Sequence, residues 1–366
     1  ESVQSDRGPW AAHPAVAPRL RFGARVHRIG RAFNDKMNDR NRAASPFVVR
    51  WRDGKGNEHE TLARAVIDAS GAWSQPNPIG VNGLPVRGEA EARGFIDYGI
   101  PDVLGAAHAR FAGKRVLVIG AGHSAINVAL DLVRLQQEAP DTEIMWALRR
   151  DRIDKLLGGG LNDQLPERGA LGVAALKAIE ERRLRMLAPF SVSQLKRAGA
   201  ALEVNARIGE TGTSFEVDRI VVATGLRPDL EMLRELRVDI DPSVEAPPRL
   251  APLIDPNLHS CGSVPPHGVV ELTHAESDFY IVGSKAYGRA PTFLMATGYE
   301  QVRSVIAELA GDSEAARRVE LVLPETGVCN TSFRGAGASA VGCEIDGAGS
   351  EAHAPEREAQ CCGAPA

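Results

Sequence analysis

A glycine segment at residues 120–125, with the sequence GAGHSA, limits what this chain can fold into more than any other feature. It follows a run of buried-type β formers at 116–119 and precedes apolar residues at helical spacing. Gly120 permits a tight strand-to-helix turn, Gly122 lets a pyrophosphate approach the backbone, and Ala125 lets the helix pack closely on the strand. The segment therefore predicts a dinucleotide-binding turn, in which the helix N-terminus faces the phosphates. The candidate contacts are Gly120, Gly122, His123, Ser124 and Ala125.

The end of the next strand indicates which dinucleotide binds. The segment EIMWALRR at 143–150 reads as a strand that runs into Arg149 and Arg150. An acidic residue at this place would bind a ribose 2′-OH, whereas an arginine accommodates a 2′-phosphate through its planar fork. The pattern favours NADPH over NADH. Two alternatives stay open: a glycine turn that is only structural, and arginines that are solvated loop residues.

Composition excludes several other classes of protein. The chain has 366 residues, which suits two domains, and a net charge of −4 with acids and bases mixed along its length. A nucleic-acid or anionic-membrane surface needs concentrated Lys and Arg, and a membrane helix needs a long apolar run; the sequence shows neither. No signal pattern follows Glu1, so we expect a cytoplasmic enzyme that continues upstream of this residue.

Two similar strand ends indicate how the chain is divided. Three strands are expected at 22–28, 46–51 and 63–69, the last two joined by the turn at 53–56. The third strand belongs to ARAVIDASG at 63–71, which is echoed by VDRIVVATG at 217–225. The repeat indicates that the chain leaves one domain at the first copy and returns to it at the second, so that the dinucleotide unit between them is an insertion.

The closing part of the body reads as a strand, FYIVG at 279–283, and a helix that starts near Thr292 and ends at Leu309. The core face of this helix is expected to consist of Leu294, Val302, Val305, Ile306 and Leu309. His108 is interpreted as a surface histidine, because the sequence places no partner near it to tune its pKa.

With these features the chain resembles the two-dinucleotide-domain flavoproteins, which include flavin-containing monooxygenases and pyridine nucleotide-disulfide oxidoreductases, over about residues 15–311. The resemblance implies an α/β fold: a split FAD-binding domain, Rossmann-like with a three-stranded β-meander, and an inserted Rossmann-like NADPH-binding domain. The boundaries that follow are 1–80 and 217–311 for FAD, 81–216 for NADPH, and 312–366 for a flexible tail that contains cysteines.

The resemblance also assigns residues to FAD. It places Ser70, Gly71, Ala223, Thr224 and Gly225 near the flavin, and Thr292 at the N-terminus of the helix that faces the ring. The family's Gly-Asp pair at the ribityl chain corresponds here to Gly283 and Ser284, so a hydroxyl replaces the carboxylate. The family's G-x-G-x-x-G after a first strand does not occur upstream of residue 22. Either an upstream segment completes the FAD site, or FAD binds weakly.

The function expected from these features is an FAD-dependent NADPH oxidoreductase of the flavin monooxygenase-like kind. Hydride passes from NADPH to flavin, and the electrons then pass to oxygen or another small acceptor. No catalytic side chain is assigned, the substrate is a small molecule, and a homodimer is left open.

Two other functions depend on the tail, which holds every cysteine except Cys261 and ends with the pair Cys361 and Cys362. This pair is a candidate for thiol or soft-metal chemistry, since soft ions favour thiolates. One alternative is a flavin reductase of thiol, soft-metal or metalloid substrates that uses this pair; the other is a non-enzymatic soft-metal or metalloid-binding protein with a regulatory dinucleotide site. A redox C-x-x-C pair does not occur in the sequence, and this favours the monooxygenase.

Overall fold

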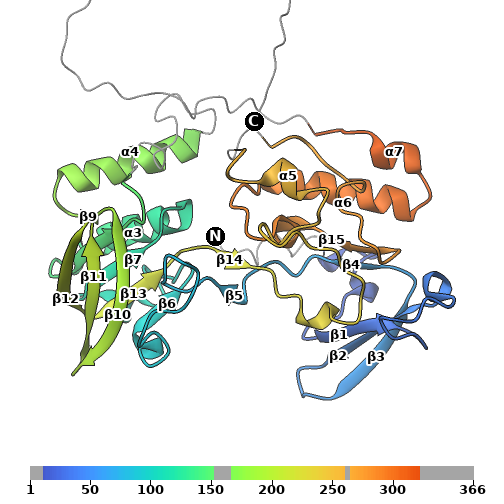
Figure 1. The fold of residues 1–366 in the computed structure, drawn as a ribbon, viewed down its shortest axis with the longest axis horizontal. Coiled ribbons are helices and arrows are strands. Elements are labelled where there is room, and N and C mark those ends of the chain that lie inside the picture. Colours follow the sequence, from blue (N-terminus) through green and yellow to red (C-terminus); the bar gives the residue numbers. More distant parts are fainter. Residues whose placement is uncertain (1–10, 152–165, 260–263, 322–366) are drawn as a thin grey trace, which may run out of the picture. The chain divides into compact units, whose positions relative to one another are not determined.

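The computed structural model describes residues 11–151, 166–259 and 264–321 (Figure 1). Its strands are β1 (Arg25–Arg31), β2 (Phe47–Arg52), β3 (Glu58–Ala63), β4 (Val66–Asp68), β5 (Gln75–Pro76), β6 (Ile96–Tyr98), β7 (Arg115–Ile119), β8 (Glu143–Ala147), β9 (Arg185–Leu187), β10 (Phe190–Ala198), β11 (Ala201–Ile208), β12 (Thr211–Val217), β13 (Arg219–Val222), β14 (Leu226–Arg227) and β15 (Phe279–Ile281). Its helices are α2 (His108–Phe111), α3 (His123–Leu135), α4 (Pro166–Glu180), α5 (Ala251–Ile254), α6 (Met295–Leu309) and α7 (Ser313–Arg317), with 3₁₀ turns η1 (Ala17–Arg19), η2 (Arg42–Ala44), η3 (Arg93–Phe95), η5 (Glu231–Leu233) and η6 (Gly283–Tyr287).

A five-stranded parallel sheet forms the centre of what we call the central unit, from β6 to β13. Its strand order is β6-β13-β7-β8-β9. Helix α3 connects the parallel strands β7 and β8, so these three elements form a βαβ unit, a connection for which the right-handed form is expected. Both faces of the sheet are covered. Val116 and Val118 pack with residues of α3 and α4, whereas Leu117 and Ile119 pack with the antiparallel meander β10-β11-β12. The continuous apolar run of β7 is explained by this burial on both faces.

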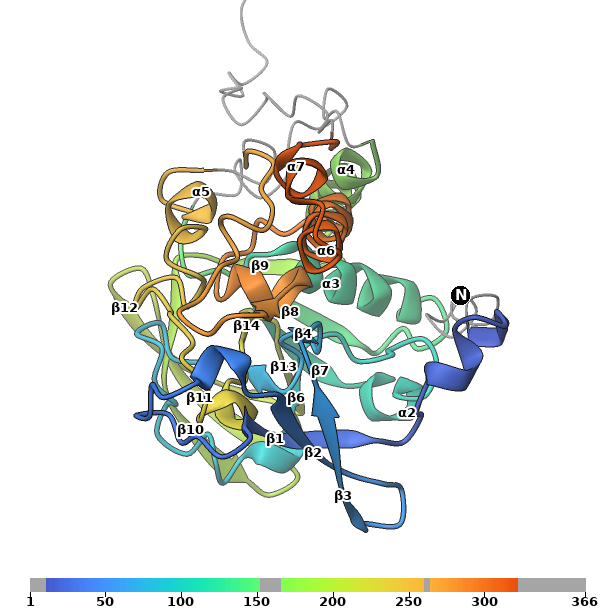
Figure 2. The ribbon, with the colours of Figure 1, turned by 90° about the vertical axis from the view of Figure 1, so that its right-hand side faces the viewer.

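The rest of the described chain, which we call the flanking unit, contains the meander β1-β2-β3 and the parallel pair β4-β15. Figures 1 and 2 show this pair between the meander and α6. The expected third strand at 63–69 is wrong in one respect. A bend at Arg64 and Ala65 divides it, so that Glu58–Ala63 completes the meander while Val66–Asp68 pairs with β15.

Strand β13 also differs from the expected division of the chain. The predicted boundary at 216/217 would assign it to the FAD domain, but it pairs in parallel with β6 and β7 in the central sheet. The connection to the flanking unit follows it: β14 pairs with β5, so the outgoing and returning segments run side by side. β13 belongs to the central sheet because its backbone pairs with β6 and β7. The sequence prediction used only the likeness between the two strand endings, which does not show which strands pair.

Helix α6 presents to the core only part of the face that its sequence indicated. Val305 is fully buried as expected, but Val302 and Ile306 are 41% and 50% exposed. The buried positions are mostly polar or small, and the polar side chains among them form hydrogen bonds that apolar residues could not. These positions are Thr297, Gly298, Glu300, Gln301 and Ser304. No helix in the described part of the chain is long and apolar enough to cross a membrane.

Candidate dinucleotide and flavin sites

The glycine turn after β7 has the geometry that its sequence predicted. Gly120 has φ +151°, and a Cβ there would lie 2.3 Å from the Ala223 carbonyl oxygen. The buried Trp146 indole donates to the Gly120 carbonyl at 2.9 Å, which fixes the turn from β8. Ala125 is fully buried at the start of α3. Only glycine therefore fits position 120, for reasons of fold.

Gly122 is different, because its surroundings are open. It is the N-cap of the 13-residue helix α3, with φ −99° and no side-chain cap hydrogen bond. Apart from its chain neighbours, no atom of the described residues lies within 4 Å of a Cβ placed on it. Gly122 and His123 are exposed and Ser124 is half-buried. Space in front of a helix N-terminus, with its positive dipole end, is what an anionic pyrophosphate requires.

Two arginines follow β8, the strand next to β7. Arg149 and Arg150 are both exposed. Arg149 lines a cavity of about 270 Å³, together with Val81, Pro189, Phe190, Ser191 and Gly209. The Gly120 amide donates to the Ala147 carbonyl, and the arginines begin two residues after Ala147. The structure brings the predicted phosphate turn and the predicted 2′-phosphate residues to the same edge of the sheet.

The second Ala-Thr-Gly ending lies at this edge too. The Ala223 amide donates to the Ile119 carbonyl at 2.8 Å, immediately before the glycine turn. Thr224 Oγ1 donates to the Asn77 carbonyl at 3.1 Å, and the Asn77 amide donates to the Gly225 carbonyl at 3.0 Å. The resemblance assigned this ending to the flavin; the structure places it at the crossing between the units and against the turn at Gly120.

The first ending, Ser70-Gly71, lies in the flanking unit beside Gly283-Ser284. Both pairs follow the carboxyl ends of parallel strands, and Gly71 and Gly283 have φ +73° and +72°. Asp68 joins the two turns, because its carboxylate accepts from the Ser70 hydroxyl at 2.6 Å and from Lys285 Nζ at 2.6 Å. Ligands of open α/β sheets bind at such carboxyl ends, so these turns form the candidate flavin site.

A chain of buried hydrogen bonds reaches the same turn from α6. The Gly283 amide donates to Gln301 Oε1 at 2.7 Å, the Gln301 amide donates to His267 Nε2 at 2.9 Å, and His267 Nδ1 donates to the Pro265 carbonyl at 3.0 Å. Burial lowers the pKa of the His267 imidazole, which keeps it neutral and able to accept from Gln301. Sequence reasoning missed His267 and Gln301, because they lie far apart in the chain and match no motif.

Other polar groups complete this region. The phenol of Tyr287 is fully buried against His267 and donates to Thr297 Oγ1, and burial raises its pKa to about 12. Thr292 is buried, but its hydroxyl donates to the Ile254 carbonyl, and α6 begins three residues later than expected, at Met295. The structure therefore brings Ser70, Gly71 and Gly283 together at the candidate flavin site. The Thr292 hydroxyl instead bonds to the Ile254 carbonyl.

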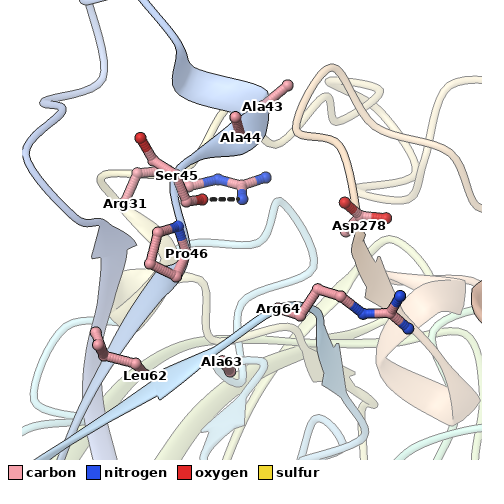
Figure 3. Close-up of a pocket in the computed structure, with 9 residues that line it drawn as sticks. All are labelled: Arg31, Ala43, Ala44, Ser45, Pro46, Leu62, Ala63, Arg64 and Asp278. Atoms are coloured by element: carbon pink, nitrogen blue, oxygen red, sulfur yellow. Dashed lines mark hydrogen bonds between the residues drawn. The ribbon is translucent and has the colours of Figure 1, made fainter.

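A second cavity, of about 240 Å³, lies before the amino ends of β4 and β15 and is bordered by Arg31, Arg64 and Asp278 (Figure 3). Its arginines already have partners. Arg31 donates to the Ser45 carbonyl at 2.7 Å and pairs with Glu276, and Arg64 donates to the Leu309 carbonyl at 3.0 Å. These groups stabilise the flanking unit, and they lie at the opposite end of the strands from the candidate flavin site.

The remaining candidates can be placed briefly. Cys361 and Cys362, and the other three cysteines, lie outside the described residues. Within residues 11–151, 166–259 and 264–321, no group of three or more His, Cys, Asp and Glu side chains could hold a metal ion. His108 lies at the surface, as predicted, but it has a partner that the sequence did not reveal, Glu138 at 3.2 Å.

Comparison with known proteins decides the family. Residues 25–278, more than half of the chain, match the family described as pyridine nucleotide-disulphide oxidoreductase. The chain belongs to this family. It is 28% identical over 215 residues to a ferredoxin–NADP reductase of Thermus thermophilus, covering 57% of this chain and 55% of that protein. The chain thus spans about half the length of this relative.

Solved structures confirm the fold. A bacillithiol disulfide reductase, Bdr, of Bacillus cereus has a TM-score of 0.53 and 16% identity, covering 85% of this chain and 75% of its own. DfoA of Erwinia amylovora, a cadaverine monooxygenase bound to FAD, has a TM-score of 0.55 and 13% identity, covering 89% and 76%. The family uses FAD and NADP(H); the relative from Thermus thermophilus is named a ferredoxin–NADP reductase, and the structure of DfoA is that of a protein bound to FAD.

Proposed function

We propose that this protein is an FAD-dependent NADPH oxidoreductase of the flavin monooxygenase-like kind, acting on a small molecule in the cytoplasm. One observation carries the proposal: the open face of Gly122 at the N-terminus of α3, next to a strand that ends in two exposed arginines. This arrangement suits a dinucleotide with a 2′-phosphate. Membership of the family adds the flavin.

In this proposal NADPH is held by the central unit. The backbone of Gly122 and the first turn of α3 bind the pyrophosphate, and His123 and Ser124 border it. Arg149 and Arg150 bind the 2′-phosphate, and Ala223 packs against the turn from β13. The fully buried Ala125 keeps α3 close to β7, which fixes the position of the helix N-terminus.

FAD is held by the turns of the flanking unit. Among residues 11–151, 166–259 and 264–321, no atom outside the chain neighbours would lie within 4 Å of an added Cβ on Gly283, so this turn is open on one side. Ser284 and Ser70 supply hydroxyls near it. These residues fit the ribityl and ring end of FAD; no glycine fingerprint for its pyrophosphate occurs upstream of residue 22. FAD, when bound, accepts hydride from the nicotinamide and passes electrons to dioxygen or another acceptor.

The choice of monooxygenase over reductase depends on the cysteines. A dithiol reductase of this fold needs a cysteine pair close to the flavin, and the sequence has no C-x-x-C. The likeness to a disulfide reductase and to a monooxygenase does not separate the two, because both share the fold. The reductase alternative is favoured by one observation, the adjacent Cys361 and Cys362.

Oxygen consumption separates these functions. The FAD-reconstituted protein, supplied with NADPH in air, is expected to consume dioxygen as NADPH is oxidised, and a Cys361→Ser/Cys362→Ser variant should do so at the same rate. NADPH oxidation that needs an added disulfide or arsenite and disappears in this variant would favour the reductase. A protein that cannot be reconstituted with FAD would exclude both.

A further inference from the structure

The proposed function does not by itself explain the buried ion pair between Asp68 and Lys285. Lys285 Nζ lies 2.6 Å from Asp68 Oδ2, and each side chain is only 1% exposed. Burying two charges costs several kcal/mol of desolvation per ion, which an apolar pair of similar volume would avoid. A pair of this kind is explained better by the geometry it enforces than by the stability it adds.

The pair is part of a hydrogen-bond network that also includes Ser70. Ser70 donates both its amide, at 3.0 Å, and its hydroxyl, at 2.6 Å, to Asp68 Oδ1. Its Oγ also accepts from Lys285 Nζ at 3.1 Å. Asp68 thus uses one oxygen for the turn that follows its own strand and the other for the turn that follows β15.

The two turns that the pair joins follow neighbouring parallel strands. In β4 and β15, Val66 faces Phe279 and Asp68 faces Ile281, so both strands end at the same edge. Asp68 is the last residue of β4, and Lys285 lies in η6, which begins at Gly283. The Val282 amide donates to the Asp68 carbonyl at 3.0 Å, which extends the backbone pairing to the start of both turns. Beyond this bond, the ion pair connects the two turns through side chains.

The turn at Gly283 is held from its other side as well. Gln301 of α6 is fully buried and accepts from the Gly283 amide at 2.7 Å. The turn is therefore fixed between α6 and β4, while the space next to the α carbon of Gly283 stays open. A rigid turn with one open side is a preorganised binding surface.

We propose that Asp68 and Lys285 are a positioning pair that sets the spacing between the Ser70–Gly71 and Gly283–Ser284 turns so that both contact one flavin. The inference rests on the proposed function, since it needs FAD to bind at these turns. It assigns no contact with the reacting atoms to either residue. If the pair has this role, its removal changes the flavin affinity and the flavin spectrum more than it changes the thermal stability of the protein.

The test compares a neutral double variant with a matched control. Asp68→Asn/Lys285→Met removes both charges together, which avoids the unpaired buried charge that either single variant would leave and that could prevent folding. Arg115→Gln/Asp218→Asn is the control, because it also neutralises both members of an ion pair, in which Arg115 Nη2 lies 2.9 Å from Asp218 Oδ1 in the central unit. FAD binding is measured by titration of the full chain, together with the visible flavin spectrum and thermal unfolding.

The double variant is expected to fold, to bind FAD about tenfold or more weakly than the wild type, and to show a shifted visible spectrum. The control is expected to lose thermal stability while its FAD dissociation constant and spectrum stay unchanged. Unchanged FAD binding and spectrum in a folded double variant would overturn the inference and leave the proposed function intact. An equal loss of affinity in the control would also overturn it, as a general loosening. Absence of FAD binding in the wild type would overturn the proposed function and this inference together.

Discussion

Gly120 and Gly122 stand two residues apart and have different physical reasons to be glycine. At Gly120 a side chain meets the Ala223 carbonyl, and the backbone lies at φ +151°. At Gly122 the backbone is ordinary, and no atom of the described residues lies within 4 Å of an added Cβ. The first glycine serves the fold, and in the proposed function the second serves the ligand.

This difference gives opposite expectations for two alanine variants. Gly120→Ala should lose roughly 1–3 kcal/mol of unfolding free energy from backbone strain alone, and more from the overlap. Gly122→Ala should lose only about 1 kcal/mol as a poorer N-cap, but should raise the Kd for NADPH roughly tenfold, or about 1.4 kcal/mol. Chemical denaturation and NADPH titration measure the two effects. Tight NADPH binding in Gly122→Ala would refute the placement of the pyrophosphate.

Arg149 and Arg150 set the cofactor preference in our account. Replacing both with Gln should weaken NADPH binding by about 10- to 100-fold, since a hydrogen bond to a charged group contributes about 1.5–3 kcal/mol. NADH binding should change little, because NADH has no 2′-phosphate. Arg134→Gln, in the last turn of α3 at its other end, is the matched control. Equal losses for NADPH and NADH would contradict a 2′-phosphate site.

Two buried histidines predict how stability depends on pH. Burial lowers the pKa of both His267 and His274, and no hydrogen-bond partner is found for either ring nitrogen of His274 within the described residues. A folded pKa below the ordinary value of about 6.5 means that the unfolded chain binds more protons. Stability should therefore be constant above about pH 6.5 and fall as the pH drops below it, by up to about 1.4 kcal/mol per pH unit for each histidine.

Thermal unfolding between pH 7.5 and 5 measures this dependence. His274→Leu should reduce the decline, whereas His13→Gln, at an exposed position, should leave it unchanged. Burial alone would raise the pKa of Glu276, but its hydrogen bonds to the arginines lower the pKa below the ordinary value for a glutamate. Glu276 is therefore protonated only at a pH below the range in which the histidines become charged. Stability that stays flat down to pH 5 would show that neither histidine is held neutral by burial.

At the scale of elements, local patterns were predictable and long-range pairing was not. β7, the glycine turn, α3 and β8 follow from neighbouring residues, and all four were expected. The bend at Arg64 and Ala65 depends on the pairing of β4 with β15, which lies more than 200 residues further along the chain. The pairing of β13 with β7 joins residues about 100 positions apart. A strand ending carries no information about which sheet accepts the strand.

Helix α6 shows the same limit in its choice of face. Its apolar residues read as a core stripe, but Gln301 and Ser304 face inward because each forms hydrogen bonds there. Ser304 Oγ accepts from the Val269 amide at 2.8 Å and donates to the Ala316 carbonyl at 2.5 Å. Those partners could not be read from the helix alone.

This face gives an element-scale prediction that hydropathy would reverse. Ser304→Val should destabilise the protein by about 1–3 kcal/mol per unsatisfied group, since the Val269 amide and the Ala316 carbonyl lose their partner in the interior. Val302→Ser, at a 41% exposed position, should change stability by no more than about 0.5 kcal/mol. Denaturant unfolding compares the two. Greater damage from Val302→Ser would mean that its face is the buried one.

At the scale of the whole molecule, the proposed function assigns NADPH binding to the central unit and FAD binding to the flanking unit. The central unit supplies the phosphate turn and the arginines, and the flanking unit supplies the two turns joined by Asp68 and Lys285. The candidate NADPH residues were almost all predictable, because a glycine motif is local. The polar connections of the flavin turns were not, since Asp68, His267, Lys285 and Gln301 come together only in the fold.

The central claim is that NADPH bound at Gly122 reduces a flavin bound by this chain, and anaerobic absorbance tests it most directly. NADPH added to the yellow, FAD-reconstituted protein without oxygen should bleach the visible flavin band. The same addition to Gly122→Ala should bleach it only at much higher NADPH concentrations. A yellow protein that neither NADPH nor NADH bleaches would contradict the claim.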